Sequence, residues 1–566
     1  MNSRHLARGA AALTLLWATT PVLAAPDGYA TEAASIVERA YPAGKPGAAA
    51  IVTEKGKVVW AGGSGMADIA ASRPIDADTV FRLGSITKQF TAAVVLQLVA
   101  EGKVSLDDPL TRFLPDYPAD KGGKATVRQL LNHTSGIQSY TGIPGWMVEA
   151  KTANAYTTDE LIAQFRDMPV EFQPGEKWNY NNSGYVLLGA VIEKVTGRPW
   201  YAEVERRIAK PLGLKSIRYG GEEAKVPAFA IGYRAGENGA FEPAQKLDMS
   251  VPHAAGALIG NVRDLAKWSQ ALHHGKVVTP ALYAEMIAPT ALPGGESAPY
   301  GYGMGRGGLH DLTMLTHNGG IFGFATNAMY VPERDLFVAV FTNADSGIAS
   351  NGVAMLRLAA AAIGKPFPTF TEAPVDTAAV EPFLGSYRID GTGATRAFFL
   401  REGKLYTRRE GASDSPVLPA GGGRFFYGPD SLNWFELVRE ADGTRTMLMH
   451  QNGATEGERA VRTGDLPPEA ATVKVARDVL AAHVGEYVTA FAPIVVAVGG
   501  DGALNLKLGD QQPVPLRALS DSEFAAVGVD AKVVFQRDGA RSVGLVIHQG
   551  GRQIVASRKD DAATVD

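Results

Sequence analysis

The chain of 566 residues contains no cysteine. This absence excludes disulfide bonds, a thiolate nucleophile, a cysteine-ligated zinc site and a lipid-modified N-terminal cysteine. The chain also lacks an excess of positive charge, because its 55 lysines and arginines are outnumbered by 59 aspartates and glutamates. Without a basic surplus to neutralise phosphates, we expect no nucleic-acid partner. The composition, 46% hydrophobic and 20% charged, is typical of a globular protein of several domains.

The motifs of two common hydrolase classes are missing. No Gly-x-Ser-x-Gly occurs, which excludes the nucleophile elbow of the α/β-hydrolases. No His-Glu-x-x-His occurs, and His273 and His274 are adjacent rather than spaced to bind one metal ion from a helix. After residue 24, no run approaches the roughly 20 apolar residues that span a bilayer, so we expect no membrane span in the mature chain.

Residues 1–24 have the layout of a secretory signal peptide. Arg4 and Arg8 precede an apolar run over 10–18, and small residues around Ala24 form a cleavage site. The mature chain then begins near Ala25. We therefore expect an exported protein that is periplasmic or extracellular.

Residues 25–364 mix short strand-like runs with helical ones. The apolar segments 48–53 and 58–61 flank a polar turn and predict a β-hairpin. Residues 85–101 contain no glycine or proline and are apolar on nearly all sides, which predicts a buried helix with Ser85 as a candidate N-cap. Further helices are expected at 127–132, 158–165, 185–195, 262–272 and 351–363, and further strands at 326–331 and 336–341. The mixture predicts an α/β domain in which helices cover an antiparallel sheet.

Two further segments, 375–463 and 474–560, lack the helical period and consist of short alternating runs with Asp-Gly turns. They also look like copies of one another. Leu384-Gly385-Ser386-Tyr387 recurs as Val484-Gly485-Glu486-Tyr487, and the offset between matching positions stays between 96 and 100 residues. The repetition predicts two duplicated antiparallel β-barrels or sandwiches.

The first motif that can carry chemistry is Ser85-Ile86-Thr87-Lys88, the one Ser-x-x-Lys of the chain. On a helix this spacing places the hydroxyl and the amine on one face. Lys88 can accept the proton of Ser85 if burial lowers the pKa of its amine, and a helix N-terminus favours a developing oxyanion. Taken alone, the motif also fits a helix cap beside a solvated lysine.

The second motif is Tyr180-Asn181-Asn182, in a loop before a helix. The phenol of Tyr180 can relay protons with Lys88, and the amide of Asn182 can hold a substrate carbonyl. Ordinary turn and cap chemistry explains this motif equally well when it is considered by itself.

The third motif is His317-Asn318-Gly319-Gly320. Its two glycines, Gly319 and Gly320, allow the backbone to approach a ligand closely. If the segment forms a strand edge, the amide of Gly320 can pair with that of Ser85 as an oxyanion hole. The alternative is a simple glycine turn.

Together the three motifs resemble those of the penicillin-binding and class C β-lactamase-like serine hydrolase family. They occur in the family's order, with 95 residues from Ser85 to Tyr180 and 137 from Tyr180 to His317. The resemblance extends over residues 30–363 and includes flanking segments: Phe81-Arg82-Leu83-Gly84, Leu130-Leu131-Asn132-His133-Thr134-Ser135-Gly136, Pro174-Gly175 and Pro211-Leu212-Gly213-Leu214.

The resemblance implies a role for each motif residue and no metal or organic cofactor. Ser85 becomes the acylated nucleophile, and Lys88 and Tyr180 become the pair that handles protons. The remaining family positions are Asn182 for substrate positioning, His317 as the third-motif residue, and Gly319 and Gly320 beside the oxyanion. His133 lies in a matching segment outside the family's catalytic set, so we interpret it as structural.

The resemblance also bears on the substrate. Family members that act on penicillins or peptide C-termini usually carry lysine where His317 stands, and a neutral histidine is a weaker anchor for a carboxylate. A catalytic domain followed by two all-β repeats resembles the D-aminopeptidases, in which a loop of the last barrel enters the active site. We therefore expect a hydrolase of small amides, esters or short peptides, with D-aminopeptidase-like substrates favoured. The alternatives are a carboxylesterase, DD-carboxypeptidase or β-lactamase of the same family, or a non-catalytic ligand-binding or sensor protein.

Overall fold

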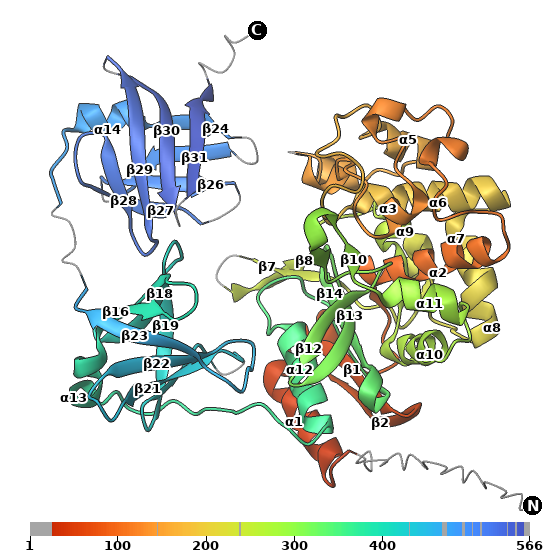
Figure 1. Ribbon diagram of the computed structural model, residues 1–566, viewed down its shortest axis with the longest axis horizontal. Coiled ribbons are helices and arrows are strands. Elements are labelled where there is room, and N and C mark those ends of the chain that lie inside the picture. Colours follow the sequence, from red (N-terminus) through yellow and green to blue (C-terminus); the bar gives the residue numbers. More distant parts are fainter. Residues whose placement is uncertain are drawn as a thin grey trace, which may run out of the picture.

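A computed structural model of the protein describes residues 25–559 apart from 144, 237–238, 429–430, 467–471, 490–492, 501, 510–511, 540 and 550–551. The chain forms a mixed α/β domain followed by two β-barrels (Figure 1). The expected signal peptide, residues 1–24, lies outside the described residues and stays a prediction.

The centre of the first domain is a six-stranded sheet in the order β12-β13-β14-β15-β1-β2, with every neighbouring pair antiparallel. Its strands are β1 (Ala48–Glu54), β2 (Lys57–Ser64), β12 (Gly305–Leu309), β13 (Leu312–Ile321), β14 (Phe324–Val331) and β15 (Leu336–Thr342). The predicted hairpin and the two predicted strands are all confirmed, and each is slightly longer than expected. Because β1 pairs with β15, the sheet brings the N-terminal and C-terminal strands of the domain together.

Helices cover both faces of this sheet, and this explains why every residue of β1 is buried. The covering helices are α1 (Tyr29–Ala40), α10 (Val262–His273) and α12 (Asn351–Ala362). Ala50 and Val52 pack in the cluster that includes α1 and α12, whereas Ile51 packs in the cluster that includes α10. Because side chains alternate across a strand, both faces of β1 need apolar residues. The predicted architecture of helices over an antiparallel sheet is confirmed.

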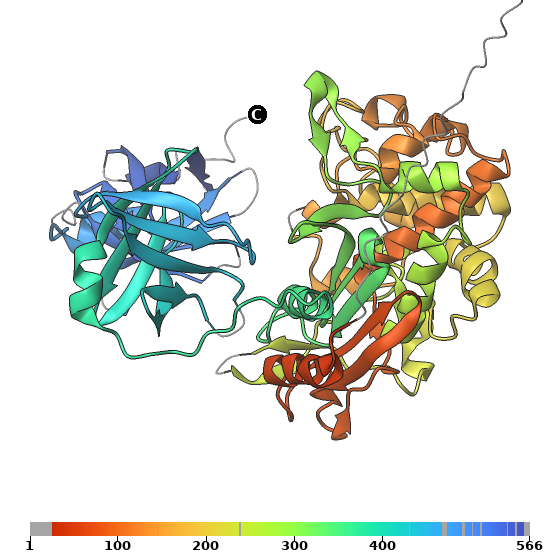
Figure 2. The ribbon, with the colours of Figure 1, turned by 60° about the horizontal axis from the view of Figure 1, so that its bottom comes forward.

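The helix that carries Lys88 lies inside a helical region beside the sheet (Figures 1 and 2). This helix, α2 (Thr87–Ala100), packs against α6 (Asn182–Thr196), α7 (Trp200–Val204) and α9 (His253–Gly256). Smaller helices complete the region: α3 (Val127–Leu131), α4 (Glu149–Thr152), α5 (Thr158–Ala163), α8 (Lys210–Leu212) and α11 (Pro280–Ile287). Phe90 of α2 stacks on Trp268 with ring centroids 4.2 Å apart. A helix surrounded in this way requires apolar residues on every side, as the sequence predicted.

Two helices start differently from the prediction. Residues Gly84–Ile86 form a 3-10 turn, η1, before α2, and no side-chain hydrogen bond caps either element, so the predicted N-cap role of Ser85 is wrong. Helix α6 begins at Asn182 rather than at residue 185, because the side chain of Asn181 accepts a hydrogen bond of 2.8 Å from the Gly184 N–H. The Ser85 hydroxyl is therefore available for other contacts.

The C-terminal part of the chain consists of two closed, eight-stranded antiparallel barrels. The first contains β16 (Gly385–Ile389), β17 (Thr395–Arg401), β18 (Lys404–Arg409), β19 (Ser415–Gly421), β20 (Arg424–Phe426), β21 (Trp434–Arg439), β22 (Arg445–His450) and β23 (Glu458–Gly464). The second contains β24 (Gly485–Val488), β25 (Pro493–Val498), β26 (Leu504–Leu508), β27 (Val514–Ala518), β28 (Glu523–Ala526), β29 (Ala531–Asp538), β30 (Arg541–Gln549) and β31 (Arg552–Arg558). Short helices α13 (Thr377–Val380) and α14 (Arg477–His483) precede them.

Matching contacts confirm that the barrels are copies. Tyr387 and Tyr487 are both fully buried, and each donates its hydroxyl hydrogen to the backbone carbonyl four residues earlier. Arg462 and Arg558 each donate to the carbonyl of the residue before the repeated glycine. The prediction left open whether each repeat is a barrel or a sandwich. Both sheets close on themselves, so the repeats are barrels, and neither has a free sheet edge.

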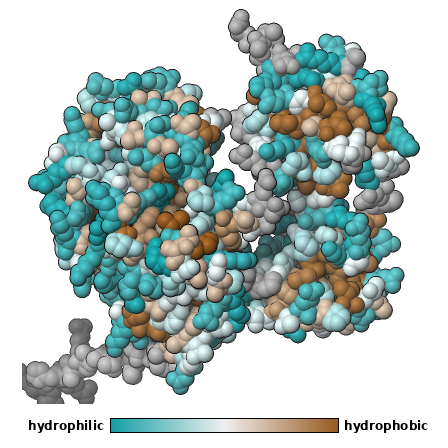
Figure 3. Space-filling view, turned by 180° about the vertical axis from the view of Figure 1, so that it is seen from behind, coloured by the Kyte–Doolittle hydropathy of each residue, from teal (hydrophilic) through white to brown (hydrophobic). Residues whose placement is uncertain are grey.

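The two barrels contact each other through backbone hydrogen bonds between residues 412–414 and 528–530. The first barrel contacts the α/β domain where Arg357 of α12 donates to the Ser431 carbonyl at 3.1 Å. Apolar side chains are visible on the outer surfaces of both barrels (Figure 3). Among the described residues, none of the helices has the length and apolar character needed to cross a bilayer.

Candidate active site

Ser85 lies at the junction of the helical region and the sheet. The turn η1 contacts β13 on one side and continues into α2 on the other. Ser85 is half-buried and borders a pocket of about 310 Å³, whereas Lys88, one turn further along, has 0% exposure. The nucleophile candidate can thus meet a substrate while the amine beside it is kept from solvent.

The amine of Lys88 has three hydrogen-bonding neighbours. Its Nζ lies 3.0 Å from Ser85 Oγ, 2.8 Å from Asn182 Oδ1 and 2.9 Å from the carbonyl oxygen of Ala255. The amide and carbonyl oxygens can only accept, so they take the two hydrogens of a neutral amine. The remaining lone pair then faces the hydroxyl of Ser85, which is the arrangement required of a base.

The surroundings of Lys88 favour this neutral form. Burial lowers the pKa of the Lys88 amine well below its usual value, since removal from water disfavours the charged form. Aromatic rings of Tyr180 and Tyr185 lie 4.8 and 5.4 Å from Nζ. No carboxylate is paired with Lys88 among the described residues to offset this desolvation. The amine can therefore accept a proton at neutral pH.

Tyr180 lies on the other side of Ser85. Burial raises the pKa of its phenol well above the usual value, and the Ser85 side chain lies near enough to oppose that rise. A protonated phenol has a hydrogen to donate, so Tyr180 can serve as a proton donor while Ser85 gives its own proton to Lys88. Tyr180 can in turn give its proton to a leaving group.

Asn182 begins α6 and borders the pocket. Its Oδ1 accepts from Lys88, and its Nδ2 donates to Thr141 Oγ1 at 2.9 Å. The sequence interpretation assigned this amide to a substrate carbonyl, whereas in the structure its oxygen orients Lys88. That substrate contact stays a prediction, and the observed bonds give Asn182 a positioning role.

His317 lies on β13 and is buried, with 4% exposure. Its Nδ1 donates to the Asn318 carbonyl at 2.6 Å, and its Nε2 accepts from the Tyr300 hydroxyl at 2.7 Å. Burial lowers the pKa of His317 to about 3. The imidazole is therefore neutral, and it does not line the pocket. Its ring centroid lies 6.2 Å from that of Tyr180, so His317 lies next to the phenol ring and outside the pocket.

The two glycines bring β13 against η1. A Cβ on Gly319 would stand 3.0 Å from the Ser85 nitrogen, and one on Gly84 would stand 3.3 Å from the Gly320 nitrogen. Any larger residue at Gly319 would also meet the Leu83 carbonyl. The pairing of β12 with β13 ends at Thr316, so the edge of β13 that follows is not covered by β12. The amides of Ser85 and Gly320 are thus close together at the pocket, as an oxyanion hole requires.

Several neighbours of the site were not identified from the sequence as site residues. These neighbours form hydrogen bonds with the site residues: Tyr300 with His317, Thr141 with Asn182, and the Ala255 carbonyl with Lys88. None belongs to a motif with a fixed spacing, and Ala255 acts through its backbone. His133, interpreted as structural, accepts the Asn181 N–H on Nδ1 at 3.1 Å and packs on Tyr180 at 4.5 Å.

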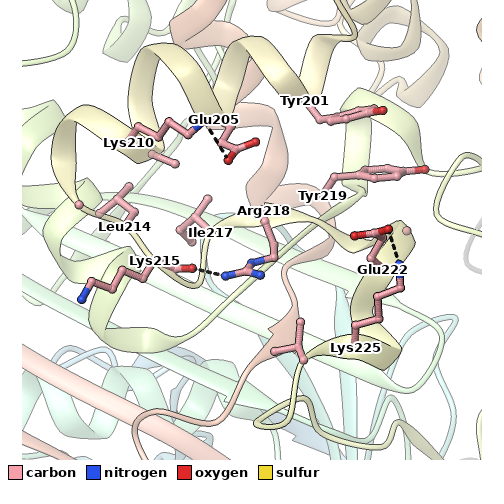
Figure 4. Close-up of a pocket in the computed structure, with 14 residues that line it drawn as sticks. Tyr201, Glu205, Lys210, Leu214, Lys215, Ile217, Arg218, Tyr219, Glu222 and Lys225 are labelled. Carbon is pink, nitrogen blue, oxygen red and sulfur yellow. Dashed lines mark hydrogen bonds and ion pairs between the residues drawn. The ribbon is translucent and has the colours of Figure 1, made fainter.

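The residues that line the Ser85 pocket all lie between Gly84 and Asp345. The barrels therefore contribute none of its described lining, and the barrel loop expected from the D-aminopeptidase resemblance is not part of this wall. A larger cavity of about 640 Å³ lies elsewhere, around Tyr201 and Tyr219 (Figure 4). There, Lys210 pairs with Glu205 and Lys225 with Glu222. No serine or threonine is among the described residues that line that cavity.

The comparisons with known proteins agree with this geometry. The Beta-lactamase family model matches residues 36–363, which is more than half of the chain. The chain belongs to the beta-lactamase family. It is a serine hydrolase of the β-lactamase and penicillin-binding protein type, and the predicted resemblance is confirmed.

Three relatives illustrate the range of this beta-lactamase family. The chain is 25% identical over 436 residues to penicillin-binding protein 4* of Bacillus subtilis, covering 73% of this chain and 94% of that protein. It is 25% identical over 422 residues to a D-aminopeptidase of Gluconobacter oxydans, covering 74% of this chain and 73% of that protein. The D-amino acid amidase of Ochrobactrum anthropi SV3, in a structure with L-phenylalanine amide, superposes with a TM-score of 0.51 at 27% identity, covering 59% of this chain and 97% of that one.

Replacing the Lys88 amine by a permanent cation tests the geometry. Lys88→Arg cannot accept a proton, so we expect the rate of Ser85 labelling by an acylating probe to fall by about 10³-fold. In the unchanged protein the rate should reach its plateau at a pH well below the usual pKa of lysine, because burial lowers the pKa of the Lys88 amine. The surface variant Lys103→Arg is the control. Near-normal labelling of Lys88→Arg, or a rate that rises through the usual pKa of lysine, would contradict the assignment.

Proposed function

We propose that the protein hydrolyses small amides or esters through an acyl-enzyme on Ser85. Ser85 Oγ attacks the substrate carbonyl while its proton moves to Lys88, and the amides of Ser85 and Gly320 stabilise the oxyanion. Tyr180 gives its proton to the leaving group, and Lys88 returns a proton to Tyr180. Water then cleaves the ester bond to Ser85. The contact of Lys88 with both Ser85 and Asn182 carries this proposal.

We propose D-aminoacyl amides and short D-aminopeptidase-like substrates as the favoured class. Lys88 and His317 are both neutral in their surroundings, and no lysine or arginine is among the described residues that line the pocket. A substrate carboxylate would find no fixed cation there, which disfavours β-lactams and peptide C-termini. The D-aminopeptidase and D-amino acid amidase relatives support the same choice. A carboxylesterase is the second candidate, since an apolar pocket accepts a neutral acyl group equally well.

We further propose that the protein acts outside the cytoplasm, in the periplasm or beyond. The basic, apolar and small-residue order of residues 1–24 supports export. N-terminal sequencing of secreted material should place the new N-terminus near Ala25.

A substrate panel separates the candidates. Purified mature protein is given D-aminoacyl amides, short-chain esters and a chromogenic cephalosporin, and we expect the amides to give the highest kcat/KM. Ser85→Ala should abolish turnover and covalent labelling, whereas Ser35→Ala, at a position that does not line the pocket, should leave both unchanged. Full activity in Ser85→Ala would refute the mechanism, and preference for the cephalosporin would refute the substrate class.

The proton-donating role of the phenol has its own test. Tyr180→Phe removes the hydroxyl and should lower kcat by roughly 10²-fold for amides, whose leaving group needs a proton. An aryl ester has a leaving group that departs without protonation, so its loss should be much smaller. Equal losses for both substrates would contradict proton donation by Tyr180.

A further inference from the structure

Asp345 is the one charged side chain among the described residues that line the Ser85 pocket. We infer that its carboxylate forms a subsite for a protonated amine carried by the acyl part of the substrate. This inference rests on the proposed function and deepens it, because it names the group that would select an aminoacyl substrate over a neutral one.

The carboxylate is oriented without being neutralised. Asp345 Oδ2 accepts the Gly323 N–H at 2.7 Å, and Oδ1 accepts the Ser346 hydroxyl at 2.9 Å. Both donors are uncharged. No lysine, arginine or histidine forms an ion pair with Asp345 within the described part of the chain. The negative charge therefore remains available to a cationic ligand.

The support behind Asp345 is rigid. It follows β15 by three residues, and the intervening Asn343 is fully buried. Asn343 accepts the Gly47 N–H and donates to the carbonyls of Met66 and Ile231, each at 2.9 Å. The Asp345 N–H also bonds the Tyr233 carbonyl at 3.2 Å. A carboxylate fixed in this way loses little conformational entropy when it binds an amine.

The position of Asp345 favours the acyl part of the substrate over the leaving group. Gly320, beside Ser85, is followed along the same wall by Ile321 and Phe322, and Asp345 holds the hairpin at Gly323. Tyr180, the donor to the leaving group, does not line this pocket. The leaving group therefore departs toward Tyr180, and the acyl group occupies the apolar pocket with its amine toward Asp345.

The neutral state of Lys88 and His317 strengthens the preference of the pocket for a protonated amine. Lys88 and His317, which would repel an ammonium if charged, both have a lowered pKa from burial. The pocket wall thus presents one negative charge and no positive one, and an amine-bearing substrate is favoured over its acetylated form.

The variant Asp345→Asn removes the charge and retains the shape. The amide oxygen can still accept the Gly323 N–H, and the amide nitrogen can donate to Ser346. Hydrolysis of p-nitrophenyl acetate reports on Ser85 chemistry, and D-alanine amide and N-acetyl-D-alanine amide serve as competing ligands at pH 7. Glu296→Gln, an exposed position that does not line the pocket, is the control for net charge.

We expect D-alanine amide to inhibit the unchanged protein more strongly than its acetylated form. In Asp345→Asn the ratio between the two inhibition constants should be about fivefold smaller. Ester turnover and the preference for the free amine should both stay within about twofold of the unchanged protein in Glu296→Gln, and added salt should weaken the preference wherever Asp345 is present. An unchanged preference in Asp345→Asn, or no preference in the unchanged protein, would overturn the subsite. Release of ammonia from D-alanine amide is measured separately. Its absence would refute the proposed amidase function while the inhibition data still decide the subsite.

Discussion

The removal of one lysine amine from water is the constraint on which the active site depends. Lys88 is fully buried, and the cost of keeping a charge there makes the neutral amine the stable form. Two oxygen acceptors, on Asn182 and Ala255, then use its hydrogens and leave the lone pair directed at Ser85. A solvated lysine at the same sequence position would be charged and could not act as a base.

The rest of the domain can be understood as support for this arrangement. Helix α2 is apolar on all sides because it must carry Lys88 into the centre of the helical region. The glycines at 84 and 319 let the strand edge approach the nucleophile, since a side chain at 319 would collide with the Leu83 carbonyl and one at 84 would crowd the backbone of residues 319 and 320. Tyr300 and His133 hold His317 and the loop of Tyr180 in place, and none of these contacts adds a positive charge. The result is a neutral, preorganised site with a single carboxylate on its wall.

Much of this could be predicted from the sequence, because both the fold and the motifs depend on local patterns. The continuous apolar run of β1 and the apolar character of α2 on nearly all sides identify the sheet and the buried helix. The fixed spacing of Ser85 and Lys88 and the repeated Gly-x-Tyr of the barrels are equally local. The N-cap role of Ser85 was wrong, because the 3-10 turn η1 precedes α2 and no sequence signal marks it. Asp345, Thr141 and the Ala255 carbonyl were missed, since tertiary structure alone brings them to the site.

The protonation state of Lys88 is the most direct test of the account. Lysine amines labelled with isotope at the terminal carbon can be followed by NMR across a pH titration, with the resonance of Lys88 assigned from its loss in Lys88→Arg. The account predicts that Lys88 shows the shifts of a neutral amine at a pH where the surface lysines are still fully charged, and that it titrates below them. A Lys88 resonance that titrates together with the surface lysines would contradict the claim that burial turns this residue into the catalytic base.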